Sequence, residues 1–375
     1  MLILPNSSLD IMLGKVAAAE KTERKIVKML AGEPDFDTPP PIRAATEQAL
    51  KVGKTRYVPA SGIVELKEAI VQNFEKRGVK SNISNILISP GARFCIFAAL
   101  AAICEEGDEV VIPTPYWNGY NGLVAAVGAK LVPTALVAFE QAITPRTKVI
   151  IINSPSNPSG EVYDEKTLAF IAELAAKRGI YVLSDEIYGE LVYDSARHQS
   201  IAALPQTNGE RVIVVDGFSK TYAMTGWRLG YMCAPVEVAK KAGALQMHIT
   251  HSPTSFAQYG ALEALSGSAD KYVAEMRGTF EKRRDMLCAG LSEIKGVKFN
   301  KPKGAFYVLL DVAGLGMNGE EFADRLLAEQ NLAVIPCADF GASNAVRLSY
   351  ACAEENLREF LARLKLFASS IARHG

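Results

Sequence analysis

The feature that most constrains the fold is a regular alternation of short apolar runs with helical stretches between about residues 85 and 235. Each run is continuously apolar, which is typical of strands that are buried on both faces of a parallel sheet. The pattern therefore predicts an α/β fold with a mostly parallel central sheet covered by helices. The runs are NILIS (85–89), EVVIP (109–113), KVIIIN (148–153), IYVLSD (180–185), RVIVVD (211–216) and LGYMCA (229–234).

The stretches between and after these runs have the composition and the apolar spacing of helices. We expect three separate helices and one long amphipathic stretch, at 93–104, 117–128, 165–178 and 236–265.

After about residue 285 the pattern of expected strands and helices changes, which predicts a smaller α+β unit. Its expected elements are VKFN (297–300), AFYVLLDV (305–312), a helix near 319–329, LAVIP (332–336), VRLSYA (346–351) and a final helix from residue 354.

The first forty residues have no parallel-strand pattern, only a candidate helix at 9–28 and the Pro-rich segment AGEPDFDTPPP (31–41). We expect them to pack with the C-terminal unit or with a partner subunit. A length of 375 residues is sufficient for two domains. The prediction is a large domain at 43–285 and a small domain formed by 1–42 and 286–375.

The charge balance and the absence of targeting signals limit the classes of partner that we expect for this chain. Lys+Arg and Asp+Glu both number 41, so no basic field exists for nucleic acid or an anionic membrane. The N-terminus MLILPNSSLDIMLG lacks the basic and apolar regions of a signal peptide, and no run reaches the ~18–20 apolar residues of a membrane span. We therefore expect a cytoplasmic protein. The six cysteines lie in apolar runs without a CxxC pair, so we interpret them as reduced core residues, and we expect no metal site.

The strongest chemical signal is FSKTYAMTGWRLGY (218–231), which directly follows the run RVIVVD. Lys220 is thereby placed beyond the carboxyl end of a strand, where open α/β sheets bind ligands. An amine there can form a Schiff base, while Ser219 and Arg228 can hold an anion. Alone, a Ser-Lys pair is more often an ordinary surface loop.

Three further polar or aromatic positions follow other strands. Asp185 ends the run IYVLSD, Asn157 lies in SPSNPSG (154–160), and Trp117 lies in PTPYWNGY (113–120). Taken singly, these residues are equally well read as a helix cap or salt bridge, an Asn-Pro turn and a core tryptophan. Together they place an amine, a carboxylate, an amide, a flat aromatic face and an anion cup at one sheet edge. Pyridoxal 5′-phosphate needs that set of groups.

With these motifs the chain resembles the fold-type I, class I/II aminotransferases. The sequences of the motifs are most similar to those of the bacterial aspartate aminotransferase group. The resemblance runs from about Met29 to the last helix, and FSKTYAMTGWRLGY, NPSG, SDEIY and VRLSYA are its specific motifs. It implies pyridoxal phosphate as the cofactor, an amino acid and a 2-oxo acid as substrates, and ping-pong transamination.

The resemblance also implies roles for individual residues. Lys220 resembles the lysine that binds the cofactor and moves the proton, and Asp185 the aspartate that faces the pyridinium nitrogen. Tyr188 and Asn157 match the pair at the ring's 3′-oxygen, and Trp117 matches the stacking ring. The implied phosphate cup consists of Ser219, Arg228 and the backbone N–H groups of Ala92 and Arg93.

Substrate and subunit contacts are implied in the same way. Arg347, in VRLSYA, matches the arginine that grips the α-carboxylate, and Gly32 matches a backbone contact near the same group. Tyr57 resembles a tyrosine that reaches the phosphate in the other subunit, which implies a homodimer with shared active sites.

Substrate choice is where the chain departs from this group. Close aspartate-specific relatives carry lysine where this chain has Arg93, which can contact a distal carboxylate or point elsewhere. The N-terminal segment also looks shorter. Aspartate or glutamate is the expected donor, while Phe36, Tyr57 and Tyr116 leave an aromatic or broad-specificity pocket open. The motifs are also compatible with a lyase on the same scaffold and, less readily, with a non-catalytic effector-binding relative.

Overall fold

The computed structural model describes residues 7–22, 24–207 and 210–371. The first six residues of the N-terminal segment, on which part of the signal-peptide expectation rests, lie outside the described residues. Within the described part, no helix is long and apolar enough to cross a membrane.

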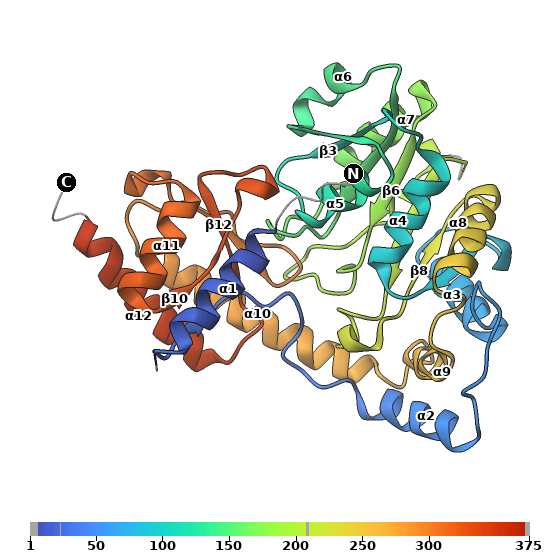
Figure 1. The fold of residues 1–375 in the computed structure, drawn as a ribbon, viewed down its shortest axis with the longest axis horizontal. Helices are drawn as coiled ribbons and strands as arrows, with labels where there is room; N and C mark the ends of the chain where they lie inside the picture. The colour runs from blue at the N-terminus through green and yellow to red at the C-terminus, as the bar shows by residue number, and fades with distance from the viewer. Residues whose placement is uncertain (1–6, 23, 208–209, 372–375) are drawn as a thin grey trace.

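A seven-stranded sheet dominates the described residues (Figure 1). Its order is β2-β8-β7-β6-β5-β3-β4, and all neighbours are parallel except the two pairs made by β8, which is antiparallel to β2 and β7. The expected mostly parallel sheet is thereby confirmed. The strands are β2 (Ile86–Ser89), β3 (Glu109–Pro113), β4 (Lys130–Thr134), β5 (Thr147–Asn153), β6 (Tyr181–Asp185), β7 (Val212–Gly217) and β8 (Gly230–Cys233).

Helices cover both faces of this sheet because successive strand residues point to opposite sides. In β5, Ile151 packs under α4, α5 and α8, whereas Ile150 and Ile152 pack under the helices of the other face. The first layer is α4 (Ala92–Ile103), α5 (Gly119–Ala126) and α8 (Val236–Ile249), and the second includes α2 (Pro40–Lys51), α3 (Val64–Lys76), α7 (Glu165–Arg178) and α9 (Ser255–Ala264). A short helix, α6 (Phe139–Ala142), follows β4.

Helix α7 shows how local sequence sets the boundaries. The Asp164 side chain accepts a hydrogen bond from the Thr167 N–H at 2.9 Å, and Gly179 ends the helix at a φ of 65°. Both are preferred at these positions, since the carboxylate satisfies a free N–H and glycine adopts the left-handed conformation without strain. The expected bounds, 165–178, are therefore those of the structure.

A second group of elements forms the other end of the molecule (Figure 1). A three-stranded antiparallel sheet, β11-β12-β9, packs with α11 (Gly319–Gln330) and α12 (Glu354–Ile371). The N-terminal segment joins this group, because β1 pairs with β10 and α1 (Ser8–Glu20) contacts β11. The strands are β1 (Val27–Lys28), β9 (Tyr307–Asp311), β10 (Leu332–Ala333), β11 (Ile335–Pro336) and β12 (Ala345–Ser349).

The long helix α10 (Asp270–Ser292) runs between the two groups in Figure 1, and the predicted boundary at residue 285 falls inside it. Its buried residues Met276, Phe280 and Leu287 belong to the same core as the C-terminal strands. The division into domains at 43–285 and at 1–42 with 286–375 stays a prediction.

Several expected elements are wrong in detail. The stretch 236–265 is two helices, because Pro253 cannot donate a backbone hydrogen bond and His251 has a φ of 63°. The helix expected at 9–28 ends at Glu20, and LAVIP divides into two short strands of different sheets. VKFN supplies only an isolated bridge from Lys298 to Asp311. Strand β4 was missed because KLVPT contains a proline and is half-exposed, as edge strands can be.

Candidate active site

A cavity of about 290 Å³ lies at the edge of the sheet where β3, β5, β6 and β7 end. The start of β8 also lies at this edge, because that strand is antiparallel to β7. The cavity brings together every predicted site residue except Tyr57. These residues are Gly32, Ala92, Arg93, Trp117, Asn157, Asp185, Tyr188, Ser219, Lys220, Arg228 and Arg347.

Lys220 lies three residues beyond β7, and its ammonium group donates a hydrogen bond to the backbone oxygen of Gly32. Burial lowers the pKa of Lys220 to about 8, with the positive charges of Arg347 and Arg228 acting in the same direction against Glu33. A lysine with such a pKa is partly neutral near physiological pH, which an amine needs in order to act as a nucleophile or a base.

Asp185 is a buried carboxylate at the end of β6 that faces the cavity. Its Oδ2 accepts a hydrogen bond from the Tyr120 hydroxyl at 2.8 Å, and its Oδ1 accepts one from the Ile187 N–H at 3.2 Å. Burial raises the pKa of Asp185 to about 6, and within the described part of the chain Asp185 forms no ion pair. A buried carboxylate in this state favours a ligand that brings a positive charge or an N–H donor.

An anion cup lines the same cavity at the first turn of α4. No side chain caps this helix, so its first N–H groups are available to a ligand. The cup leaves no room for a side chain at either of two glycines. A Cβ on Gly91 would lie 2.6 Å from Nη2 of Arg228, and a Cβ on Gly230 would lie 2.4 Å from the Ala92 nitrogen. Arg228 itself has a φ of 53°, a conformation that side-chain-bearing residues seldom adopt and that clusters at functional sites. Ser219, also buried, lines the same cavity.

Arg347 lies on β12, in the C-terminal group, and also lines the cavity. Its Nη1 donates to Oδ1 of Asn157 and its Nη2 donates to the Leu30 oxygen, both at 3.1 Å, while its buried Nε has no partner among the described residues. The guanidinium lies over the Tyr307 ring at 4.5 Å. Arg347 is thus a buried cation that forms no ion pair in the described residues, which suits it to bind a carboxylate.

Aromatic groups complete the walls. The Tyr188 and Tyr307 hydroxyls are 2.9 Å apart, and burial raises the pKa of both phenols. The Arg93 guanidinium lies 4.8 Å from the centre of the Trp117 ring. Trp117 was expected inside a helix, but α5 begins two residues later, so the indole belongs to the loop that follows β3.

Tyr57 is the predicted site residue that this cavity does not include. Its side chain is 84% exposed and stacks on His251 with ring centres 4.4 Å apart. Sequence reasoning in turn missed Tyr120, Tyr307 and Asn153. Tyr120 follows Trp117 by three residues and belongs to the same motif, PTPYWNGY, whereas Tyr307 lies in an apolar strand with no such signal.

Comparison with known proteins agrees with this geometry. The family described as aminotransferase class I and II matches residues 24–364. The chain is 42% identical to a probable aspartate/prephenate aminotransferase of Aquifex aeolicus, over 89% of both chains. It is also similar to the structure of aspartate aminotransferase from Thermus thermophilus with maleate (TM-score 0.92, 37% identity, 97% of both chains). An aromatic aminotransferase structure from Pyrococcus horikoshii gives a TM-score of 0.90 at 36% identity, over 95% of this chain and 99% of that one.

Proposed function

The chain belongs to the class I and II aminotransferases, and from this premise we propose that it moves an amino group from aspartate or glutamate to a 2-oxo acid such as 2-oxoglutarate. The family and the fold class predicted from the motifs are thereby confirmed, and the protein is a transaminase. The observation that carries the proposal is the presence of Lys220 and the unpaired Arg347 in one cavity.

The cavity fits pyridoxal 5′-phosphate, which we propose as the cofactor. The close cradle formed by Gly91, Gly230 and Arg228 suits a phosphate, and Asp185 suits a protonated ring nitrogen. Trp117 offers a flat face, Ser219 and the α4 N–H groups complete the phosphate cup, and Lys220 supplies the amine. Asn157 and Tyr188 are proposed to contact the ring's 3′-oxygen.

The chain's own groups would divide the work as follows. When bound, the cofactor supplies an electron sink that weakens bonds at the substrate Cα. Arg347 binds the substrate α-carboxylate and so fixes the orientation of the Cα–H bond. Lys220, with its lowered pKa, takes the proton from the substrate Cα and later delivers it to a carbon of the cofactor. Asp185 holds the proton on the ring nitrogen.

Arg93 is proposed to recognise the distal carboxylate of an acidic substrate. Its guanidinium lies over the Trp117 ring in the wall of the cavity, and it forms no ion pair within the described ranges. Burial lowers the pKa of Arg93, as does the neighbouring Arg228, so an anionic ligand would relieve the repulsion between these two cations. A relative named for prephenate adds prephenate to the candidate acceptors.

An aromatic or broad-specificity activity is the second candidate, favoured by the similarity to the Pyrococcus enzyme. The residues from which sequence suggested an aromatic pocket do not support it directly. Phe36 packs on Phe280, Tyr116 donates to Asn121, Tyr57 is exposed, and none of the three lines the cavity. The side chain of an aromatic substrate in this cavity would instead contact Leu9, Ile96 and Trp117.

We further propose a homodimer in which Tyr57 reaches the phosphate bound by the partner subunit. Its high exposure is compatible with the proposal, because the ring is free to contact a second subunit and tyrosine is enriched at interfaces. The proposed division into a large and a small domain places Lys220 and Arg347 on different domains, with the substrate between them.

The decisive experiment mixes the pyridoxal phosphate-loaded protein with single amino acids, without a 2-oxo acid, and records the loss of the visible absorption band. Fast loss with aspartate and glutamate supports the proposal. Faster loss with phenylalanine or tyrosine supports the second candidate. No loss with any amino acid contradicts transamination and favours a lyase.

A further inference from the structure

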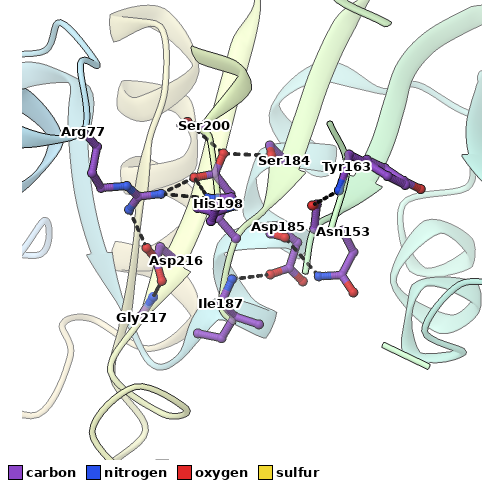
Figure 2. A network of polar contacts seen from close by, with 12 residues as sticks. Arg77, Asn153, Tyr163, Ser184, Asp185, Ile187, His198, Ser200, Asp216 and Gly217 are labelled. Carbon is purple, nitrogen blue, oxygen red and sulfur yellow. Dashed lines mark hydrogen bonds and ion pairs between the residues drawn. The ribbon is translucent and has the colours of Figure 1, made fainter. Parts of the chain in front are cut away.

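Behind the cavity, a buried group of ions joins the ends of two strands. Glu186 directly follows Asp185 and is fully buried, but unlike Asp185 it does not line the cavity. Its carboxylate accepts hydrogen bonds from the Ser184 and Ser200 hydroxyls at 3.0 and 2.8 Å, and contacts His198 at 3.0 Å. Figure 2 shows Arg77, His198 and Asp216 together, with Asp185 and Asn153 beside them. We call Arg77, Glu186, His198 and Asp216 the buried ion network.

Arg77 is the member that spans the two strands. It lies at the C-terminal end of α3, and its Nη2 pairs with Glu186 beyond β6. Its Nη1 donates to Oδ2 of Asp216, in β7, at 2.8 Å. A planar guanidinium can make these two contacts at once, whereas an ammonium group is a single point charge. Arg77 thus ties the end of β6 to the end of β7.

These two strand ends carry opposing parts of the proposed active site. Asp185 is the residue before Glu186, and Lys220 follows Asp216 by four residues. Backbone hydrogen bonds join these strand ends up to the Glu186 N–H and the Val215 oxygen, which are 2.8 Å apart. Arg77 adds a side-chain bridge beyond this ladder, so the spacing between the carboxylate and the amine depends on both. Resting on the proposed function, we infer that Arg77 is a positioning residue of the reaction, which holds Asp185 and Lys220 in register and neutralises the carboxylates behind them.

The charges of the buried ion network support this assignment. Burial alone would raise the pKa of Glu186, but His198 and Arg77 lower it to about 2. Burial raises the pKa of Asp216, against the effect of Arg77, and the nearby Tyr231 phenol has a pKa well above its usual value. Glu186 and Asp216 each raise the pKa of Asp185 in turn. Without Arg77, Asp216 would lose its ion-pair partner and Glu186 would keep only its contact with His198, so the surroundings of Asp185 would become more negative.

The test uses the loaded enzyme and the pH midpoint of its visible band, which follows protonation at the lysine–cofactor link. In Arg77→Met the midpoint should rise by about 0.5–1, because the loss of a nearby positive charge favours the protonated form. In Glu186→Gln it should fall by a similar amount. The double variant should return close to wild type. Arg77→Met should also lower kcat roughly tenfold with KM within about twofold.

Two further variants separate this role from a structural one. Arg77→Lys keeps the charge but not the bridge, so it should keep the midpoint and lower kcat. Arg284→Met removes another arginine, fully buried, that pairs with Asp194 and Asp285 away from the cavity. It should lower the unfolding temperature without moving midpoint or kcat.

Opposite shifts in Arg77→Met and Glu186→Gln are the supporting result, and Arg77→Lys with Glu186→Gln suffices if Arg77→Met does not fold. An unmoved midpoint in Glu186→Gln, or a kcat in Arg77→Lys equal to wild type, would overturn the inference. The band and the turnover of the wild-type enzyme report on the proposed function by themselves, so the two failures are distinguishable.

Discussion

Asp185 and Glu186 are neighbours in the chain, both buried at the end of β6, yet their surroundings drive them in opposite directions. The pKa of Asp185 is raised to about 6 by burial, while the pKa of Glu186 is lowered to about 2 by His198 and Arg77 in spite of its burial. Successive residues at a strand end point to opposite sides of a sheet. On one side of this edge the Glu186 carboxylate pairs with Arg77 and His198, and on the other side Asp185 forms no ion pair within the described residues.

The same contrast separates the half-buried Arg77 from the buried Arg347. Arg77 pairs with two carboxylates, whereas Arg347 donates to an amide and a backbone oxygen and forms no ion pair within the described residues. Burying an unpaired charge is costly, and a fold that keeps one gains from it only when a ligand pairs with it. Unsatisfied charge thus distinguishes the cavity from the buried ion network more clearly than burial does.

The comparison would break most completely if Lys220 were dispensable. We expect Lys220→Ala to abolish the pH-sensitive visible band and to lower kcat by at least about a thousandfold, since no other lysine lines the described cavity. Absorbance titration and single-turnover assays measure both. A mutant that keeps an unchanged band would remove the assignment.

Arg347→Ala tests the unpaired cation. We expect it to raise KM for every amino donor, through about 2–5 kcal/mol of lost binding to the shared α-carboxylate. Arg284→Ala is the matched control, because that buried arginine is already paired. A loss confined to particular donors would place Arg347 at the side-chain pocket instead.

Much of this site could be predicted because its residues follow strand ends. A ligand group at the end of a buried apolar run or a few residues beyond it, as Asp185 and Lys220 are, is placed by the topology of a parallel sheet alone. Helices with local start and stop signals were equally predictable, as Asp164 and Gly179 show for α7.

What could not be predicted depends on partners far apart in the chain. Arg77 meets Glu186 and Asp216 across more than one hundred residues, and no local pattern marks that pairing. Tyr307 reaches Tyr188 from a strand of the other group of elements. The antiparallel direction of β8 also depends on its neighbours β2 and β7, because the apolar run itself is the same for either direction.

Asp185→Asn tests the contrast between Asp185 and Glu186 through the free energy of unfolding. A carboxylate whose folded pKa is raised from 3.8 to about 6 stabilises the fold fully only below the lower value, and that contribution is lost as the pH rises through about 6. We therefore expect the cofactor-free variant to be about 3 kcal/mol more stable than wild type at pH 8 and little changed at pH 4. Denaturant unfolding at the two pH values measures this.

Glu186→Gln provides the opposite sign. Because its folded pKa is lowered from 4.5 to about 2, Glu186 stabilises the fold above pH 4.5 and loses this contribution as the pH falls towards 2. The variant should be less stable than wild type at pH 8. Equal signs for the two substitutions would contradict the distinction between the two sides of the strand.

The smallest expected effect concerns Tyr120, whose hydroxyl is the side-chain donor to Asp185. Tyr120→Phe keeps the ring that packs edge-on against Trp117 but removes the hydrogen bond that stabilises the carboxylate. The pKa of Asp185 should then rise further, so the carboxylate holds a proton on the ring nitrogen less well, and kcat should fall roughly tenfold with KM nearly constant. Tyr116→Phe loses a hydroxyl bonded to Asn121 instead and should leave kcat within about twofold of wild type. Equal losses in the two variants would show that the cavity side of β6 responds to packing and not to the charge state of Asp185.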